Sequence, residues 1–476
     1  MRPQVYAQSM YGDFPPGDIA PQPFKLNFQP QSANGKVILP KGMIILALPQ
    51  SGQEQPVDSV IYTGKLANGV SLRDQWKLIQ PNNHTWNWSY FDSEVANAQA
   101  AGKSVMLRIN TQDGSCPGWV KNQVTNVIDT NSGTQVQLWW DPTYIALSQA
   151  LWQAAAARYA NVPCVKYIAM NPPSTGGGDW QVPYQNAGNW KTTTNWNIPA
   201  VGSTVNLLPA AGNPPIYQGS YVLVQGTAGY MGWFYVFNVN GSSNAPTSID
   251  IQNQGTPAYA PTPNAAPGTS VPSSMGLSQN MIFNWTQVYG YTTQNLLGGI
   301  MAVADTQFKA FPRQHFSMSF GTNGGLDTAV NPAYTNQTAA QMIANACYTK
   351  YGSRFSMAKN GMKANTPWPN ANAGTIWEIF NLCPYINREA QFFWWSAGDP
   401  TYLNNGGVPA DPVLVLQQSA QIAAAYGVSR LEYYMQDVEL LQSCNIVFRQ
   451  MPLIAQSRTS FTPRTIGYLG PNKIGV

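Results

Sequence analysis

The side chains that could do chemistry in this sequence are mainly carboxylates. Only two histidines, His84 and His315, are present, together with five widely separated cysteines. That supply is too small for a His-rich metal site, and most Ser-His or Cys-His nucleophile arrangements lose the base they need. The cysteines are odd in number and form no CxxC pair, so a disulfide framework is not indicated. We therefore expect any hydrolysis to rely on Asp and Glu, with no metal and no cofactor.

The composition narrows the range of partners. The chain has 476 residues and a formal net charge of +4, from 25 basic and 21 acidic residues. No block of Lys and Arg could follow a phosphate backbone, so nucleic acid is not expected as a partner. Only 10% of the residues are charged, whereas 12% are aromatic. An uncharged polar surface with exposed aromatic rings suits sugars and protein neighbours.

The first 40 residues are rich in Pro, Gln and Asn, and they lack the basic and apolar regions of a secretory signal. The apolar run from Met43 to Leu48 is too short to span a bilayer, which takes about 18 residues or more. We expect a protein made in the cytoplasm that does not insert into a membrane. Residues 1–40 are predicted to form an extended arm that docks onto a neighbour.

The rest of the chain alternates short apolar runs with longer amphipathic segments, which is typical of βα units around a parallel sheet. Eight strands are predicted: Met43 to Leu48, Gly69 to Leu72, Val105 to Ile109, Val165 to Met170, His315 to Phe320, Phe355 to Ala358, Gln391 to Ser396 and Arg430 to Met435. The helices are predicted at Asp92 to Ala101, Pro142 to Tyr159, Thr293 to Ala310, Thr338 to Tyr351 and Pro412 to Tyr426. The predicted fold class is α/β, a (β/α)8 TIM barrel. A doubly wound open sheet is the alternative, although the first strand is not followed by its Gly-rich fingerprint.

Two segments interrupt this alternation. Residues 195–274 are rich in Gly, Pro, Ser and Thr and carry short alternating strands such as Tyr221 to Gln225. They predict a small all-β domain inserted after strand 4. The barrel would then comprise residues 41–194 and residues 275–476, the latter including a C-terminal tail. Residues 122–137 predict a smaller hairpin after strand 3, with its turn near Ser132.

Several stretches, taken in order, resemble the glycoside-hydrolase (β/α)8 barrel superfamily. Residues 69–73 (GVSLR), 86–88 (WNW) and 102–109 (GKSVMLRI) resemble its second and third units. Further matching stretches are 117–120 (PGWV), 141–144 (DPTY), 290–292 (GYT), 398–402 (GDPTY) and 431–437 (LEYYMQD). The resemblance implies a barrel that meets carbohydrate at the carboxyl ends of its strands. An active member would hydrolyse O-glycosyl bonds with carboxylate acid/base chemistry.

The inserted segment resembles a different group, a short β module of bacteriophage tail-fibre and collar proteins. The stretches that carry this resemblance are 201–205, 219–225, 232–239, 249–254 and 265–271. It implies a component of a virion, with other virion proteins as partners. A symmetric homo-oligomer is also plausible on this interpretation.

The barrel resemblance implies where catalytic carboxylates would lie. In such barrels the acid/base residue follows strand 4, and retaining enzymes place a nucleophile about 5 Å away, often after strand 7. Asp179 aligns with the acid position, with sugar binding or a loop cap as its alternative roles. Asp399 is the first carboxylate after strand 7. Glu432 fits the family's E-x-Y-x-x-D pattern, and it could equally form a structural salt bridge with Arg73 or Arg108.

Substrate-binding residues are predicted from their positions at the carboxyl ends of the strands. Arg73 and Arg108 end strands 2 and 3, where they would bind sugar hydroxyls or pair with carboxylates inside the barrel. Polar residues on or beyond strands 3, 6, 7 and 8 face the ligand or cap turns: Asn110, Asp113, Asn360, Gln391 and Asp437. Aromatic platforms for sugars, or rings packed under the loops, are Trp119, Trp139, Trp140, Trp180, Trp394 and Trp395.

Three functions fit these observations. The first is a virion protein of a phage tail fibre or adsorption apparatus whose barrel binds, and in an active form cleaves, host surface polysaccharide. The second is a free-standing glycoside hydrolase. The third is a catalytically inert virion protein that uses the barrel as a rigid spacer.

Overall fold

The computed structural model describes about twenty stretches of the chain. They are residues 42–47, 56–64, 67–111, 113–129, 132–170, 188–198, 202–208, 215–226, 229–252, 266–271, 273, 277–279, 285, 288–320, 336–362, 386–392, 403–404, 408–409, 422–423 and 426–435. The predicted arm over residues 1–40 lies outside them.

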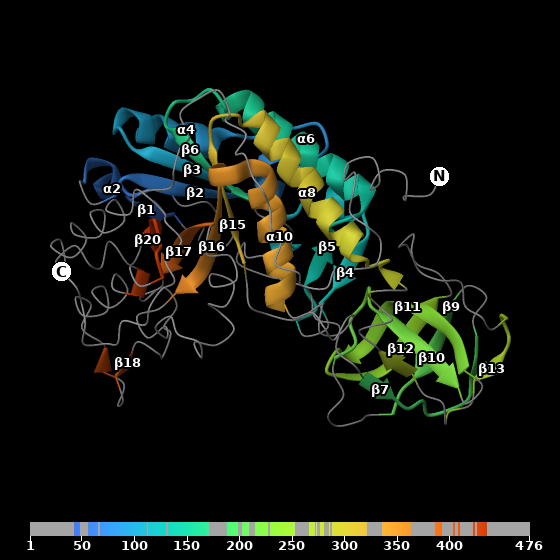
Figure 1. The fold of residues 1–476 in the computed structure, drawn as a ribbon. Helices are drawn as coiled ribbons and strands as arrows, with labels where there is room; N and C mark the ends of the chain where they lie inside the picture. The colour runs from blue at the N-terminus through green and yellow to red at the C-terminus, as the bar shows by residue number, and fades with distance from the viewer. Residues whose placement is uncertain are drawn as a thin grey trace.

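A closed barrel of parallel strands forms the centre of the fold (Figure 1), in the order β1-β2-β3-β6-β15-β16-β17-β20. The strands are β1 Gly42–Leu46, β2 Gly69–Gln75, β3 Ser104–Asn110, β6 Val165–Met170, β15 His315–Ser319, β16 Phe355–Met362, β17 Asn387–Phe392 and β20 Arg430–Tyr434. Closure depends on the pairing of β20 with β1, in which Glu432 lies opposite Ile44. The predicted (β/α)8 barrel is thereby confirmed, and the open sheet is excluded.

Seven of these strands lie where the apolar runs predicted them, with shifts of a few residues at their ends. The seventh barrel strand, β17, is the exception, because it begins at Asn387 rather than at Gln391. Its first half contains Arg388 and Glu389, both buried. The predicted strand did not include these two residues, whose charged side chains the fold buries with partners.

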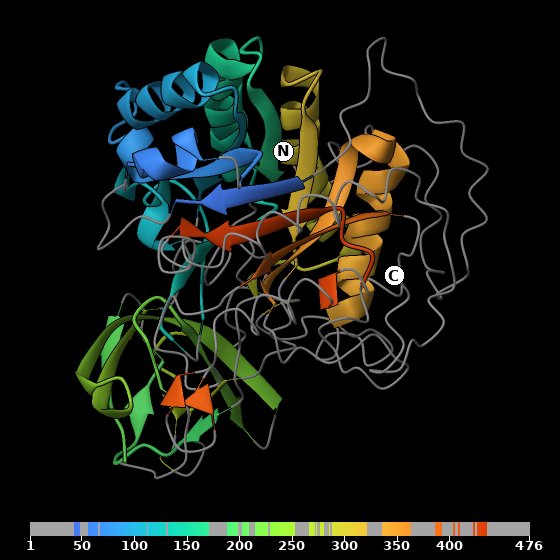
Figure 2. The same ribbon diagram turned by 90° about the vertical axis from the view of Figure 1, so that its left-hand side faces the viewer.

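Helices cover the outside of the barrel (Figures 1 and 2). The longer ones are α4 Ser89–Ala100, α6 Pro142–Tyr159, α8 Thr293–Ala310 and α10 Asn336–Tyr351. Short helical turns occur at α2 Ser59–Thr63, α3 Trp76–Ile79, α5 Gly118–Lys121, η1 Asp113–Ser115 and η3 Gly352–Arg354. The bounds of α6 and α8 are those predicted from the sequence. Most of the predicted helix from Pro412 to Tyr426 lies outside the described residues.

Local signals explain where α6 begins. Asp141 precedes it, and its side chain accepts hydrogen bonds from the backbone N–H groups of Thr143 and Tyr144, as a helix N-cap does. Pro142 occupies the first helical position, where its missing N–H costs nothing. Asp141 also accepts a hydrogen bond from the Thr125 backbone N–H at 2.9 Å, so the same side chain joins the helix to the preceding excursion.

A main hydrophobic core lies between the outer face of the barrel and the helices. On β2, Val70 and Leu72 belong to this core, as do Leu107 of β3 and Ile168 of β6. Successive residues of a strand point to opposite faces. The residues that alternate with these apolar ones, such as Arg73 and Arg108, therefore face the inside of the barrel.

A six-stranded antiparallel sheet is inserted between β6 and α8, in the order β7-β14-β10-β11-β12-β9. Its strands are β7 Gly188–Trp190, β9 Gly202–Asn206, β10 Tyr221–Gly226, β11 Gly229–Ser242, β12 Ala245–Gln252 and β14 Leu277–Gln279. A separate pair joins β8 Trp196–Asn197 to β13 Ser270–Val271. The sheet extends past residues 195–274 at both ends, because β7 pairs with β14.

Aromatic rings fill the junction between this sheet and the barrel. The Trp139 and Trp285 rings are stacked, with centroids 6.4 Å apart, and Tyr289 packs edge-on against Tyr221 of β10 at 6.2 Å. Trp140 Nε1 donates a hydrogen bond to the Tyr289 carbonyl at 2.8 Å. Tyr221 belongs to the main core. The sheet is therefore packed against the barrel layer, as its position beside the barrel in Figure 1 indicates.

The smaller excursion after β3 forms the predicted hairpin. Strands β4 Asn126–Ile128 and β5 Gln135–Gln137 pair antiparallel. Gly133 has a φ of 73°, the left-handed conformation that a tight turn needs at one position. A further short pair, β18 Leu403–Asn404 and β19 Val408–Pro409, lies between β17 and β20 in the sequence.

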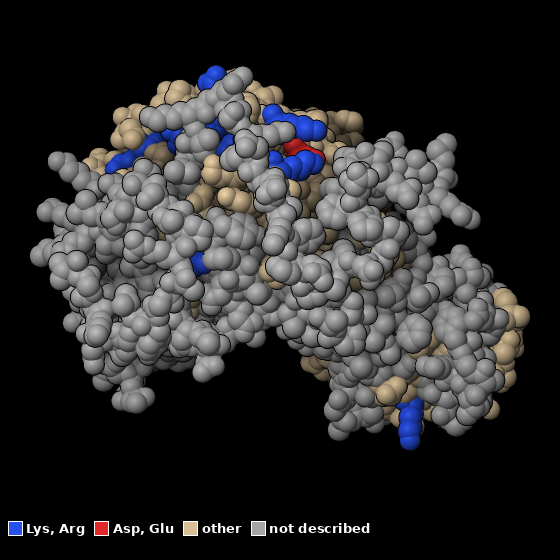
Figure 3. All heavy atoms as spheres, viewed as in Figure 1, with Lys and Arg blue, Asp and Glu red and all other residues tan. Residues whose placement is uncertain are grey.

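The described charges are scattered on the surface. On the face shown in Figure 3, the described Lys and Arg side chains form small separate groups. Within the described residues, no helix is both long enough and apolar enough to cross a membrane.

Candidate functional site

The inside of the barrel is polar, although barrel interiors are usually filled by branched apolar side chains. Among the described residues, Ile44, Met106, Tyr167 and Ala169 form an apolar group there. Many of the other described inward positions carry guanidinium, carboxylate, imidazole, amide or hydroxyl groups. This concentration of buried polar side chains is the strongest candidate for a functional site in the described part of the chain.

One ion pair crosses the inside of the barrel. Arg108 Nη2 donates to both carboxylate oxygens of Glu432, at 3.1 Å and 2.8 Å. Arg108 lies on β3 and Glu432 on β20, and β1 and β2 separate these two strands in the barrel. The side chains can therefore meet only across the interior. Both are buried, with side-chain exposures of 4% and 8%.

A second group of polar side chains surrounds Glu389. Ser317 Oγ donates to Glu389 Oε2 at 2.8 Å, and Arg430 forms a salt bridge with the same oxygen. His315 Nε2 lies 2.6 Å from Ser356 Oγ and 3.4 Å from Glu389 Oε1. The Arg430 guanidinium also lies 4.3 Å from the centre of the Tyr167 ring, a cation–π contact. We call His315, Ser317, Ser356, Glu389 and Arg430 the Glu389 cluster.

Competing effects set the ionisation of Glu389. Burial by itself favours the neutral acid and raises the pKa. The Arg430 charge opposes this effect, as do the contacts with His315 and Ser317, and together they lower the pKa to about 2. Glu389 is therefore a fixed anion at neutral pH. It can hold a cation or accept hydrogen bonds, but it cannot donate a proton to a leaving group.

A small cavity, with room for about one water molecule, lies between the Arg108–Glu432 pair and the Glu389 cluster. Its lining comprises Arg108, Ser317, Ala358, Asn360, Glu389, Ala390, Arg430 and Glu432. Asn360 is 6% exposed. Its Nδ2, like Arg108 Nε and Arg430 Nη1, has no hydrogen-bond acceptor in the part of the chain that the structure describes. Buried donors of this kind call for an acceptor such as water or a ligand.

Several predicted binding residues lie around this interior. Arg73 and Asn110 are buried at the carboxyl-terminal parts of β2 and β3, in register with Arg108 and Gln75 respectively. The salt bridge that was one of the two interpretations of Glu432 is present, with Arg108 as its partner. The fold thus brings together Arg108, Asn360 and Glu432, which are far apart in the sequence.

Three of the predicted aromatic platforms, Trp119, Trp139 and Trp140, lie in the part of the chain that the structure describes. Trp140 is 5% exposed and Trp139 2%, and their rings pack against Trp285 in the junction described above. Neither has a face that a sugar could reach, so the platform role of Trp140 is not supported. Trp119 is partly buried: its ring packs edge-on against Trp76 and its Nε1 donates to the Gln80 carbonyl.

Other predicted site residues lie outside the described residues: Asp179, Trp180, Trp394, Trp395, Asp399 and Asp437. The side chains of Asp113 and Gln391 are likewise not described, although their backbones lie in η1 and β17. Asp179 and Asp399, proposed as catalytic carboxylates, therefore remain predictions.

The sequence interpretation missed the Glu389 cluster. A signal for it exists in β15, where His315, Ser317 and Ser319 alternate with the core residues Phe316 and Met318. That period of two marks a strand with one polar face, and in a closed barrel such a face points inward. Recognising it would have required knowing that the inside of this barrel is polar.

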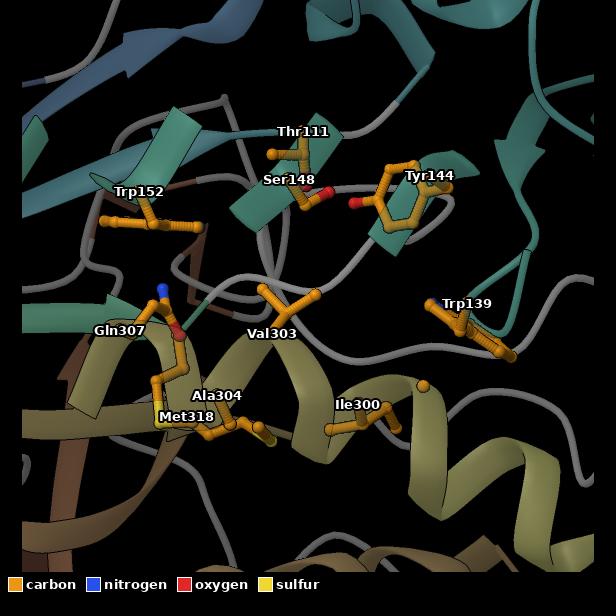
Figure 4. A pocket seen from close by; sticks show the side chains of 12 residues that line it. Thr111, Trp139, Tyr144, Ser148, Trp152, Ile300, Val303, Ala304, Gln307 and Met318 are labelled. Carbon is orange, nitrogen blue, oxygen red and sulfur yellow. The ribbon is translucent and has the colours of Figure 1, made fainter. Parts of the chain in front are cut away.

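A larger cavity lies outside the barrel between α6 and α8. Figure 4 shows side chains of the two helices facing each other across it, among them Tyr144 and Trp152 from α6 and Ile300 and Gln307 from α8. Its lining includes no Asp, Glu, His, Lys or Arg. Burial also raises the pKa of Tyr144, which keeps that phenol protonated. The cavity is a gap in helix packing rather than a site for acid/base chemistry.

Metal binding is not indicated by the described side chains. Among them, no three His, Cys, Asp or Glu residues are grouped in a way that could hold a metal ion.

Comparisons with known proteins add the following. No family model and no curated protein matches the sequence. Among solved structures, the catalytic domain of a beta-amylase from Paenibacillus polymyxa is 11% identical, with 89% of this chain and 100% of that chain covered and a TM-score of 0.46. A beta-galactosidase from the psychrophilic Marinomonas ef1 is 9% identical, with 87% and 60% covered and a TM-score of 0.43.

A cold-adapted beta-galactosidase from Rahnella sp. R3 is 10% identical, with 82% of this chain and 52% of that chain covered and a TM-score of 0.39. This chain thus spans less than two thirds of either galactosidase. All three are glycoside hydrolases by name.

Replacing Arg108 by Met should destabilise the protein by about 3 to 5 kcal/mol, because it leaves the Glu432 carboxylate buried without its cation. The measurement is the free energy of unfolding in urea. The double variant Arg108→Met/Glu432→Leu serves as the control. Because it removes both charges, its free energy of unfolding should fall less than that of the single variant. A single variant as stable as the native protein would show that the pair is not buried as described.

The depressed pKa of Glu389 predicts acid sensitivity. Its ordinary value is 4.5 and the folded value is about 2. The stabilisation is therefore fully present above about pH 4.5, and it is lost as the pH falls toward about 2. At about 1.4 kcal/mol for each pH unit, it is worth about 3 kcal/mol. Urea unfolding between about pH 5 and about pH 2.5 should show a shallower fall for Glu389→Gln than for the native protein. If the free energy of unfolding fell equally with pH in both proteins, the depressed pKa of Glu389 would be contradicted.

Proposed function

We propose that this protein binds polysaccharide at the inside of its barrel, with the Arg108–Glu432 pair and Asn360 forming the polar floor of the site. The observation that carries this proposal is the set of buried hydrogen-bond donors around the interior cavity, Asn360 Nδ2 above all. Sugar hydroxyls are both donors and acceptors, so one hydroxyl can satisfy such an amide while donating to a neighbouring carboxylate.

The charge of the cavity lining also favours a neutral ligand. Glu432 neutralises Arg108, and Glu389 neutralises Arg430, so the two guanidinium groups that line the cavity are already engaged. An anion such as a phosphate would have to displace a buried carboxylate from its partner, at a cost of several kcal/mol. A neutral, hydroxyl-rich ligand needs only the donors that remain.

Hydrolysis of glycosidic bonds is the second candidate, favoured by the position of Glu432. Its carboxylate is buried, faces the cavity and is held by a cation, as a nucleophile or a stabilising anion would be. The other carboxylate of the cavity cannot supply the proton, because the pKa of Glu389 is about 2. A glycosidase mechanism therefore requires an acid from elsewhere, and we propose Asp179 for this role.

The test measures both binding and cleavage on a panel of bacterial surface polysaccharides. Asn360→Ala should weaken binding about tenfold, because one buried hydrogen bond is lost. Asp179→Asn and Glu432→Gln should abolish reducing-end release from any polysaccharide that the native protein cleaves. Binding is measured by affinity electrophoresis and cleavage by the increase in reducing ends.

Asn97→Ala is the matched control, since this Asn is exposed on α4, outside the barrel. Its binding should equal that of the native protein. A native protein that binds none of the polysaccharides would overturn the proposal, and so would binding that Asn360→Ala leaves unchanged. Binding without cleavage would remove the hydrolase candidate and leave the binding function.

A location in a phage virion is the finer part of the proposal, and it rests on the residue pattern of 201–271 and on the arm over residues 1–40. On this basis the barrel would bind host polysaccharide during adsorption, with other virion proteins, and other copies of this chain, as neighbours. Mass spectrometry of purified phage particles should detect the chain at a fixed ratio to the tail proteins. Its absence from particles of a phage that encodes it would leave the free-standing protein as the alternative.

A further inference from the structure

An exposed tryptophan lies in a loop between two helices on the outside of the barrel. Trp86 is 36% exposed, in the loop over residues 80–88 that joins α3 to α4. Among the Trp side chains that the structure describes, only that of Trp86 is exposed. Large aromatic side chains stabilise a protein by burial, so an exposed one that the core does not need is a candidate binding residue.

The Trp86 ring is held in a defined orientation. It stacks on Trp88, with ring centroids 5.6 Å apart and an angle of only 6° between the planes. Trp88 is in turn fixed by an edge-on contact with Tyr159 of α6 at 5.7 Å and by Phe91 of α4. One face of Trp86 is therefore covered by Trp88, and its exposed area lies elsewhere on the ring. Because Trp88 packs on the outer helices, this loop is separate from the inside of the barrel.

Backbone contacts fix the loop around this ring. Asn82 and Thr85 form an isolated antiparallel bridge, and the His84 N–H donates to Asn82 Oδ1 at 3.0 Å. The Asn87 N–H donates to the Ile79 carbonyl at 2.7 Å. Asn87 Oδ1 accepts from both the N–H and the hydroxyl of Ser89. A loop ordered in this way loses little conformational entropy when it binds a ligand.

The side chains around Trp86 favour a sugar over other ligands. Residues 80–90 (QPNNHTWNWSY) contain no Lys, Arg, Asp or Glu, so His84 is the one side chain among them that could make an ionic contact to a phosphate or to a charged peptide. Asn82, Asn83, Thr85 and Asn87 are exposed, and their amides and hydroxyl can bond to sugar hydroxyls. A lone apolar side chain surrounded by amides is too small a patch for a stable protein interface. The C–H face of a pyranose matches the negative face of an indole ring.

We propose that the loop over residues 80–88 is a second carbohydrate-binding site, in which Trp86 stacks on a neutral pyranose ring and neighbouring Asn side chains bond to its hydroxyls. This site would hold a polysaccharide chain on the outside of the barrel. It does not depend on the interior site, because it shares no residue with it.

The experiment locates binding directly at Trp86 in the full-length chain. The protein is labelled with 5-fluorotryptophan, and the ¹⁹F resonance of Trp86 is identified by its loss in Trp86→Phe. Cellohexaose, maltohexaose, xylohexaose and chitohexaose are then titrated separately to millimolar concentrations. We expect a saturable shift of the Trp86 resonance with at least one of them, and none with glycerol at the same concentration. No shift with any of the four sugars would overturn the proposal.

Variants measure how much the Trp86 ring contributes to sugar binding. Calorimetric titration with the sugar that shifts Trp86 should show about tenfold weaker binding for Trp86→Ala and a smaller loss for Trp86→Phe, which keeps an aromatic face. Phe237→Ala is the matched control, because Phe237 of β11 is 38% exposed and remote in the sequence. It should bind as the native protein does. Equal losses in Trp86→Ala and Phe237→Ala would contradict a specific site.

One further titration distinguishes binding at the outer loop from binding inside the barrel. In Glu432→Gln the Trp86 resonance should shift as in the native protein, whatever happens to binding inside the barrel. A Trp86 shift together with unchanged affinity in Asn360→Ala would keep the outer site and remove the interior one. Loss of binding in Asn360→Ala, together with a Trp86 resonance that does not shift, would keep the interior site and remove the outer one.

Discussion

The arrangement inside the barrel depends on the neutralisation of buried charges. A carboxylate or guanidinium taken out of water without a partner costs several kcal/mol, and the described interior holds both kinds. Arg108 and Glu432 meet across the barrel, while Arg430 pairs with Glu389 on the neighbouring strand. These contacts constrain the relative positions of β3, β17 and β20, because each charge needs its partner within hydrogen-bonding distance. Closure of the barrel and compensation of the charges are therefore linked.

Because the interior is polar, the hydrophobic stabilisation must come from elsewhere. The main core lies between the outer face of the strands and the helices, where Leu107, Ile168 and Phe316 are completely buried. The inserted sheet adds its own core, which includes Val222, Phe234 and Ile251. Burial of such apolar side chains supplies roughly 1.5 to 3 kcal/mol each. The polar interior therefore contributes little to the hydrophobic stabilisation of the fold. Its hydrogen-bond donors can bind a ligand instead.

The two proposed carbohydrate sites would bind sugars through different interactions. Inside the barrel, buried amide and guanidinium donors gain strength from their exclusion from water, and each donor left without an acceptor favours binding. On the outer loop, an exposed indole ring offers a flat apolar face, and its orientation is fixed by Trp88 rather than by burial. An interior site discriminates between sugars by hydrogen-bond geometry. A stacking site accepts many sugars and mainly retains the chain near the protein.

Much of the fold could be predicted from the sequence, because local patterns determine it. The apolar run of β6 and the periodicity of α6 and α8 gave the observed bounds, since each element carries its own burial pattern and caps. The prediction failed for β17, where Arg388 and Glu389 are buried. No local pattern distinguishes such a strand from a loop, because the partners that make burial tolerable lie on other strands.

The sequence by itself determined the class of fold, and it made carboxylates the candidates for any hydrolytic chemistry. It also left Glu432 with two possible roles, and it could not show which aromatic rings are exposed. Only the tertiary structure decided that Glu432 is held by Arg108, that Glu389 is a fixed anion, and that Trp140 is buried while Trp86 is exposed. The physical reason is that ionisation and exposure depend on neighbours distant in the sequence, which become neighbours only when the barrel closes.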